Sequence, residues 1–577
     1  ITMDGKPWPS GALTLAWIPE QDVGGKDNKR SDELRIRASN LELAGLEGIR
    51  PLAAKLSPAL GDVWRSTQPS GKINTLALDI PLQAADKTRF QASWSDLAWK
   101  QWKLLPGAEH FSGTLSGSVE NGLLTASMKQ AKMPYETVFR APLEIADGQA
   151  TISWLNNNKG FQLDGRNIDV KAKAVHARGG FRYLQPANDE PWLGILAGIS
   201  TDDGSQAWRY FPENLMGKDL VDYLSGAIQG GEADNATLVY GGNPQLFPYK
   251  HNEGQFEVLV PLRNAKFAFQ PDWPALTNLD IELDFINDGL WMKTDGVNLG
   301  GVRASNLTAV IPDYSKEKLL IDADIKGPGK AVGPYFDETP LKDSLGATLQ
   351  ELQLDGDVNA RLHLDIPLNG ELVTAKGEVT LRNNSLFIKP LDSTLKNLSG
   401  KFSFINSDLQ SEPLTASWFN QPLNVDFSTK EGAKAYQVAV NLNGNWQPAK
   451  TGVLPEAVNE ALSGSVAWDG KVGIDLPYHA GATYNIELNG DLKNVSSHLP
   501  SPLAKPAGEP LAVNVKVDGN LNSFELTGQA GADNHFNSRW LLGQKLTLDR
   551  AIWAADSKTL PPLPEQSGVE LNMPPMN

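Results

Sequence analysis

The sequence contains no cysteine, which excludes disulfide bonds, cysteine-ligated zinc and thiol catalysis. It has no run of about 18 or more apolar residues, so it predicts no membrane-spanning helix. Its start, ITMDGKPWPS, lacks a basic and apolar signal segment. Lysine and arginine are outnumbered by aspartate and glutamate, 52 against 68, and they form no cluster of the kind that phosphate contacts require. Nucleic acid is therefore not an expected partner.

Both ends of the sequence lie close to strand-like segments. GALTLAW stands near the start, and VELNM stands just before the last residues. We expect the chain to be a piece of a longer protein, whose membrane anchor lies outside it.

The chain is long and rich in turn residues. Its 577 residues exceed what one hydrophobic core usually organises, so we expect several modules or one long repetitive body. The 53 glycines and 38 prolines are spread along it, which favours many short strands over a few long helices. The sequence therefore predicts a mostly β protein with a few short helices.

Internal repeats indicate that this β body arose by duplication. The pentapeptide LDIPL begins at Leu78 and again at Leu364, and LTAS follows at Leu124 and again at Leu414. A third copy lies between these two. There LRNAKFAFQP matches the later LRNNSLFIKP, and LTNLDIELDFIN matches LKNLSGKFSFIN at the same spacing.

Four segments begin with proline and continue as a short amphipathic run, at Pro51, Pro212, Pro340 and Pro455. Proline suits the first turn of a helix because its missing N–H has no helical partner there. We expect four short helices, the first near 51–57 and the second at about 212–228. The predicted units are 1–75, 76–185, 186–330, 331–450 and 451–577, the last with a Pro-rich loop at 498–510.

The strand-like segments alternate apolar and polar residues with period two. In YQVAVNLNGNW, residues 436–446, every second side chain is apolar, so each strand has one apolar face and one polar face. The predicted lining of the apolar face comprises Val258, Val260, Phe267, Phe269, Leu283, Phe285, Val379, Leu381, Leu386, Ile388, Phe402, Phe404, Val438, Val440, Leu442, Tyr484, Ile486 and Leu488.

An apolar sheet face must be covered, and a closed sandwich core is the ordinary solution. Here the helices are too few and too short to cover several repeated units. A sheet curled into a long antiparallel groove is the alternative, and hydrocarbon chains suit such a groove. With strands about 4.8 Å apart, roughly 30 strands give a body on the order of 140 Å long.

Catalytic patterns are weak in this sequence. The seven histidines are scattered singly, and no GxSxG, HExxH or Walker A motif occurs. The acidic pairs Asp322 and Asp324, and Asp355 and Asp357, have the spacing of solvated strand residues, although calcium binding or a carboxylate dyad is the functional alternative.

Sixteen tryptophans raise the alternative of a carbohydrate platform, with Trp94, Trp99 and Trp102 as its candidate members. Packing at the edge of a groove is the favoured interpretation, because the indole has an apolar ring and a polar N–H.

Three stretches carry a resemblance to a known family. They are WRYFPENLMGKDLVDYLSGAIQGGEADNATLVYGGNPQLFPY from Trp208, the following GQFEVLVPLRNAKFAFQPDWPALTNLDIELDF, and HLPSPLAKPAGEPL from His498. The chain resembles the AsmA-like family of bacterial envelope proteins, in particular its YhdP branch, over nearly its whole length.

The resemblance implies a long β-groove that is anchored in the inner membrane by an N-terminal helix, spans the periplasm and carries phospholipid toward the outer membrane. Its implied partners are phospholipid acyl chains and the two membranes or their proteins. It implies no catalytic residues, no metal and no cofactor. A structural envelope scaffold with a closed core and an enzyme that modifies envelope polysaccharides are the two remaining alternatives.

Overall fold

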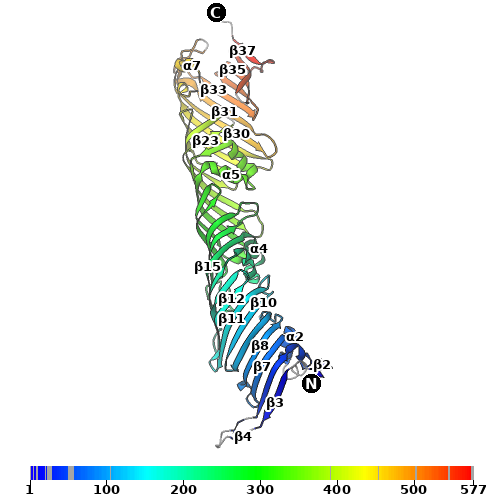
Figure 1. Ribbon diagram of the computed structural model, residues 1–577. Helices are drawn as coiled ribbons and strands as arrows, with labels where there is room; N and C mark the ends of the chain where they lie inside the picture. Colours follow the sequence, from blue (N-terminus) through cyan, green and yellow to red (C-terminus); the bar gives the residue numbers. More distant parts are fainter. Residues whose placement is uncertain are drawn as a thin grey trace.

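The computed structural model describes residues 2–3, 6–7, 11–19, 21–22, 29–30, 32–49, 58–103, 105–389, 392–452, 454–500, 503–543 and 546–573. Figure 1 shows an elongated body with the N-terminal and C-terminal segments at opposite ends. The strands cross its long axis, so their order in the chain is also their order along the body. The prediction of a mostly β chain curled into a long groove with a few short helices is confirmed.

One sheet contains 31 of the described strands. Its first half consists of β3 (Ala12–Ile18), β6 (Glu33–Glu42), β7 (Ser70–Pro81), β8 (Arg89–Trp99), β9 (Ala108–Ser118), β10 (Asn121–Met133), β11 (Leu143–Asn157), β12 (Gly160–Ala172), β13 (Val175–Pro186), β14 (Trp192–Thr201), β15 (Ile228–Gly242), β16 (Gln255–Phe267), β17 (Leu276–Ile286), β18 (Gly289–Leu299), β19 (Val302–Ile311) and β20 (Lys318–Pro328).

The second half of the sheet consists of β21 (Leu352–Asp355), β22 (Asp357–Pro367), β23 (Thr374–Ile388), β24 (Ser393–Ile405), β25 (Asp408–Ser411), β26 (Leu414–Trp418), β27 (Gln421–Glu431), β28 (Ala435–Trp446), β30 (Val466–Pro477), β31 (Thr483–Asp491), β33 (Ala512–Asn520), β34 (Ser523–Ala530), β35 (Asn534–Leu541), β36 (Thr547–Ala554) and β37 (Gly568–Asn572). Three two-stranded ladders stand apart from it: β1 (Thr2–Met3) with β2 (Lys6–Pro7), β4 (Gln21–Asp22) with β5 (Lys29–Arg30), and β29 (Leu462–Gly464) with β32 (Val495–Ser497).

Strand pairing follows the chain. Most strands of the sheet pair antiparallel with the next strand in the chain, and only the last described pair, β36 with β37, is parallel. At two places a neighbour is split in two: β23 pairs with both β21 and β22, and β24 pairs with both β25 and β26. Such local pairing keeps contacts short-range over a very long body.

Because successive antiparallel strands reverse direction, their connections gather alternately at two edges of the groove. We call the edge with the shorter connections, such as 158–159, 287–288 and 432–434, the turn rim. The opposite edge, which we call the helix rim, carries the connections from β14 to β15 and from β20 to β21.

Every α-helix that the structure describes belongs to a connection at the helix rim. The described helical elements are η1 (Leu43–Ile49), α2 (Pro58–Thr67), η2 (Ala85–Lys87), η3 (Gly204–Tyr210), α3 (Glu213–Met216), α4 (Lys218–Ala227), η4 (Tyr314–Lys316), η5 (Gly329–Ala331), α5 (Val332–Asp337), η6 (Lys342–Gly346), α6 (Ala347–Glu351), η8 (Pro448–Lys450), α7 (Glu456–Ala461) and η9 (Leu492–Asn494).

Helices lie at three of the four proline-led segments. The segment from Pro212 forms α3 and α4, the segment from Pro340 forms η6 and α6, and Pro455 directly precedes α7. The helix expected near 51–57 lies outside the described residues. Helices α2 and α5 were not predicted from the sequence. The boundaries of the five units stay a prediction.

The duplicated asparagines have a physical reason. Asn264 and its repeat counterpart Asn383 have φ of 50° and 56°, in the left-handed region that asparagine tolerates better than other residues with a side chain. Each lies inside a break in strand register, directly before the residue at which pairing resumes, so the asparagine forms part of a β-bulge. Asn287 and Asn406 are equivalent turn residues, and the Oδ1 of each accepts a backbone N–H of the preceding hairpin.

This conformation predicts the effect of substitution at Asn383. Asn383→Val places a β-branched residue at positive φ and should lower the free energy of unfolding by about 1–2 kcal/mol. Asn383→Gly keeps the conformation accessible and should change it much less. Urea unfolding of both variants measures the difference, and equal losses would contradict a backbone origin.

Candidate functional site

One face of the sheet is uncharged across its first half. Residues paired directly across antiparallel strands lie on the same face. A row of such partners crosses the sheet from β3 to β16 without a charged side chain. Its members are Leu13, Ala38, Leu76, Ala92, Leu115, Leu124, Ile152, Gly165, Phe181, Ile195, Tyr240 and Phe256.

The same face continues through the middle of the sheet. A second row, four residues farther along β16 from Phe256, passes from β16 to β23 through Val260, Leu283, Met292, Ala309, Ile321, Leu364 and Ala375. Four residues along β23 from Ala375, the partners Val379 on β23 and Phe402 on β24 extend the same face.

A third uncharged row crosses the end of the sheet. It runs from β26 to β37 through Leu414, Val425, Leu442, Gly470, Leu488, Val515, Gly528, Phe536, Trp553 and Leu571. The three rows together form a face of uncharged side chains along the body, which we call the apolar face.

Charged side chains are placed on the opposite face. Lys293 and Glu282 form an ion pair there, with 2.8 Å between Nζ and Oε1, and Lys401 pairs with Glu378 at 2.6 Å. Lys516 lies 3.6 Å from Glu487 farther along. The alternation predicted from the sequence therefore places apolar side chains on one face of the sheet and charged side chains on the other.

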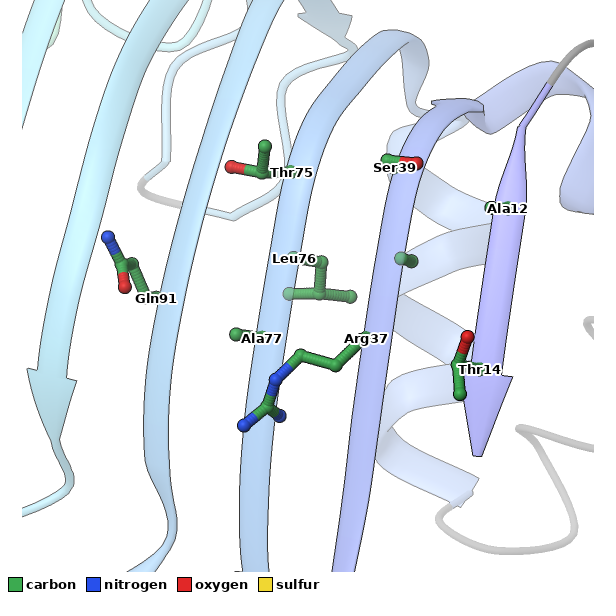
Figure 2. Close-up of a pocket in the computed structure, with 9 residues that line it drawn as sticks. Ala12, Thr14, Arg37, Ser39, Thr75, Leu76, Ala77 and Gln91 are labelled. Atoms are coloured by element: carbon green, nitrogen blue, oxygen red, sulfur yellow. The ribbon is translucent and has the colours of Figure 1, made fainter. Parts of the chain in front are cut away.

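Figure 2 shows a hollow near the beginning of the sheet that belongs to this polar face. Arg37, Ala77 and Gln91 are register partners on β6, β7 and β8, and the short Ala77 side chain leaves space between the two longer ones. Arg37 donates to Asp79 at 2.7 Å and to the Leu78 carbonyl at 2.9 Å. Its guanidinium is therefore engaged by its own sheet.

The structure places the predicted lining residues of the strands on the apolar face. Val258 opposes Phe285, Val260 opposes Leu283, and the rest follow the same register; Phe269 lies just past β16 and packs against the central core. Those that are buried are Phe267, Leu283, Val379, Leu381, Val438 and Leu442. Those that are half-buried are Val258, Val260, Phe269, Phe285, Leu386, Ile388, Phe402, Phe404, Val440, Tyr484, Ile486 and Leu488. Contact of these side chains with lipid stays a prediction.

Exposure of the apolar face changes along the body. In β7 to β14 most of its side chains are half-buried, such as Leu124, Ile152 and Phe181, and the same holds for Ile486 and Val517 near the other end. In between, burial is nearly complete: the exposed fraction is 4% for Leu283, 0% for Leu290 and 0% for Ile311.

The central section is covered by the connection between β14 and β15. We call residues 203–227, which contain η3, α3 and α4, the first crossing segment. It starts at the helix rim, where the Tyr210 hydroxyl donates to the Lys173 carbonyl at 2.6 Å. The Phe211 ring reaches Phe285 near the turn rim, with centroids 6.4 Å apart, and Gly217 lies near Glu317 of the turn rim.

Helix α4 leads the first crossing segment back across the groove to the helix rim. Its Leu220, Val221 and Leu224 are at most 1% exposed and join one core with the lining of β16 to β20. The Tyr223 hydroxyl then donates to the Phe269 carbonyl at 3.0 Å, back at the helix rim. The segment therefore spans the mouth of the groove.

A second crossing segment, residues 329–351, spans the groove between β20 and β21. At the helix rim the Gly329 N–H donates to the Gly356 carbonyl at 2.7 Å. Farther on, Leu345 is buried against Tyr436 and Val438, close to the turn rim. The Tyr436 hydroxyl donates to the Ser407 carbonyl or Thr429, and burial raises its pKa to about 12.

Sequence reasoning placed short helices at these two connections but did not foresee that they cross the groove. The available signal was the apolar stripe of Leu220, Val221 and Leu224, which indicates one apolar helix face. It does not say which surface that face meets.

Aromatic rings lie over glycines of the neighbouring strand along the apolar face. A Cβ atom added to Gly165 would lie 2.2 Å from the Phe181 ring, and one added to Gly528 would lie 1.9 Å from the Phe536 ring. The missing side chain lets each ring lie across the adjacent strand. The sequence did not reveal these pairs, because they depend on the register between strands.

The weaker chemical candidates have structural partners. Asp322 contacts His363 at 2.8 Å, and Asp324 accepts a hydrogen bond from the Asn306 amide at 2.9 Å. Asp355 caps the N–H of Gly356. Within the described residues, no group of three or more histidines and carboxylates is arranged to hold a metal ion.

The three tryptophans of the carbohydrate alternative do not form one platform. Trp94 and Trp99 both contact Phe111, at interplanar angles of 25° and 85°. Trp102 instead lies beneath the Lys103 ammonium, 4.8 Å away.

The ring-over-glycine arrangement predicts a coupled pair. Gly165→Val should collide with the Phe181 ring and lower the free energy of unfolding by about 1–3 kcal/mol. Adding Phe181→Ala should recover part of this loss, because the space of the ring becomes free. A double-mutant cycle measured by urea unfolding tests this, and strictly additive losses would contradict the contact.

No helix among the described residues is long and apolar enough to cross a membrane. No solved structure matches the chain. The family model described as YhdP protein matches residues 1–577, the whole length of the sequence. The chain therefore belongs to the YhdP family.

Proposed function

We propose that this protein transfers lipid along the apolar face, carrying phospholipid across the periplasm between the inner and outer membranes. The observation that supports this best is the continuity of the uncharged rows from β3 to β37. Family membership supports a bridge-like lipid transfer role in the envelope.

The energetics favour a continuous apolar path. Moving one chain of about 16 carbons into water costs on the order of 10 kcal/mol, at about 0.8 kcal/mol for each CH₂ group. A lining of carbon atoms removes most of this cost at every position. Acyl chains would occupy the groove while the polar headgroup stays in solvent at its open side.

The uncharged lining also favours movement over tight binding. An ion pair with a phosphate headgroup would hold a lipid at one place, whereas aliphatic side chains such as Ile152, Ile486 and Val515 offer similar environments on different strands along the body. At about 4.8 Å between strands, the sheet is roughly 140 Å long, a length suited to a bridge.

The proposal involves no catalytic step, because transfer along a groove breaks no covalent bond. A structural envelope scaffold is the second candidate. The tightly packed section around Leu283 and Leu290 favours it, since a scaffold needs a closed core and no cargo. Native mass spectrometry of the purified chain separates the two: bound phospholipid supports transfer, and a lipid-free chain supports the scaffold.

A charge on the apolar face should weaken lipid binding where it is placed. Val440 lies on this face between Phe427 and Val472, and the exposed Ala439 beside it faces the other way, between Ser428 and Gly473. Val440→Asp should lower the amount of co-purifying phospholipid by the share that this part of the groove holds, because a carboxylate next to hydrocarbon is costly.

Ala439→Asp is the matched control and should leave lipid content unchanged. It is a better control than Asn441→Asp, because the Asn441 amide already donates to Asp426 at 2.7 Å and a second carboxylate would repel the first. Circular dichroism shows whether both variants fold. Equal lipid content in two folded variants would contradict the assignment of faces.

A further inference from the structure

The first crossing segment occupies a stretch of the apolar face that is otherwise equivalent to its open stretches. Leu283 and Met292 beneath it continue the rows of uncharged residues, yet they are only 4% and 3% exposed. The groups that cover them are side chains of the segment itself, including Phe211, Leu220 and Leu224. These side chains present hydrocarbon to the lining, as an acyl chain would.

We propose that the lining under residues 203–227 is a concealed acyl-chain site, which a lipid enters by displacing the crossing segment. This inference rests on the proposed function. It adds that the groove has open binding sections on both sides and a closed section in the middle, where the protein's own apolar side chains take the place of cargo.

Displacement of the crossing segment by a lipid replaces one set of apolar contacts with another. The contacts of Leu220, Val221 and Leu224 with the lining are apolar and non-directional, so an acyl chain can take the place of these side chains. The hydrogen bonds that displacement breaks lie outside the lining, such as the one from the Tyr223 hydroxyl to the Phe269 carbonyl at the helix rim. Among the described residues, the hydrogen bonds of the tip at 211–218 go to its own segment and to the loop 134–142. None of them joins the tip to the turn rim.

The loop 134–142 holds the segment in place through Arg140. Its guanidinium donates to Glu213 and, at 2.6 Å, to Asp222, while the Val138 carbonyl accepts the N–H of Glu213. Hydrogen bonds from Lys218 and Arg140 lower the pKa of Asp222, which keeps the carboxylate charged at neutral pH. Arg140 therefore acts as a latch on the first crossing segment.

A cross-link across this latch tests the proposal. The natural chain has no cysteine, so a variant with Arg140→Cys and Asp222→Cys carries the only two thiols, and a short bismaleimide can join them. The photoreactive residue p-benzoylphenylalanine replaces Phe285, which lies beneath Phe211, or Phe181 in the open section. Vesicles of phosphatidylglycerol with tritiated acyl chains supply the lipid.

The unlinked protein should capture tritiated lipid from both positions. The linked protein should lose capture at Phe285 at least tenfold and keep it at Phe181. Capture at Phe181 together with equal capture at Phe285 in both forms would overturn the inference and leave the proposed function standing. So would capture at Phe181 with none at Phe285 in either form. No capture at either position would overturn the proposed function itself.

A second measurement avoids the cysteine pair. Arg140→Ala removes the latch and should raise capture at Phe285 several-fold in the otherwise natural chain. Arg178→Ala is the matched control, since Arg178 pairs with Asp169 on the polar face and lies 68% exposed. Unchanged capture in Arg140→Ala would overturn the role of Arg140, and an equal increase in Arg178→Ala would show that the effect is not specific to the latch.

Discussion

The constraint on which this molecule depends is a strand register that keeps each apolar side chain on the same face. Since side chains alternate between faces with period two, a slip of one residue between any two neighbouring strands would bring charged side chains into the apolar row. Bulges add a residue and threaten this order. The left-handed asparagines Asn264 and Asn383 stand at such bulges, and Leu279 and Leu398 on the next strands remain on the apolar face beyond them.

Because the chain alternates between the two rims, each connection between strands lies at one rim or the other. All described α-helices belong to connections at the helix rim, so no described α-helix lies in a connection at the turn rim. Two helix-rim connections extend over the groove, one packed through Leu220 and Leu224 and the other through Leu345. Open and covered sections of the same apolar face are thus a product of the apolar side chains that these two connections carry rather than of any change in the strands beneath.

Much of this design could be predicted from the sequence, because period-two alternation is local. Val440 and Ile486 could be assigned to one face from their own strands alone, and the repeats revealed that the units share a plan. The crossing of residues 203–227 could not be foreseen, since the apolar stripe of α4 fits any apolar surface. The pairing of Phe181 with Gly165 was hidden because it depends on two strands meeting in one register. Helix α2 begins at a proline of its own, Pro58, which was not among the proline-led segments of the prediction.

The rings that lie over glycines have a consequence for motion. A ring standing upright would form a ridge, and a hydrocarbon sliding past it would meet a steric barrier at each such strand. Laid across Gly165 or Gly528, the ring adds polarisable contact area with little height. Under the proposed function, a hydrocarbon moving from strand to strand would therefore meet low barriers of similar height, so that its movement would resemble one-dimensional diffusion rather than hopping between traps.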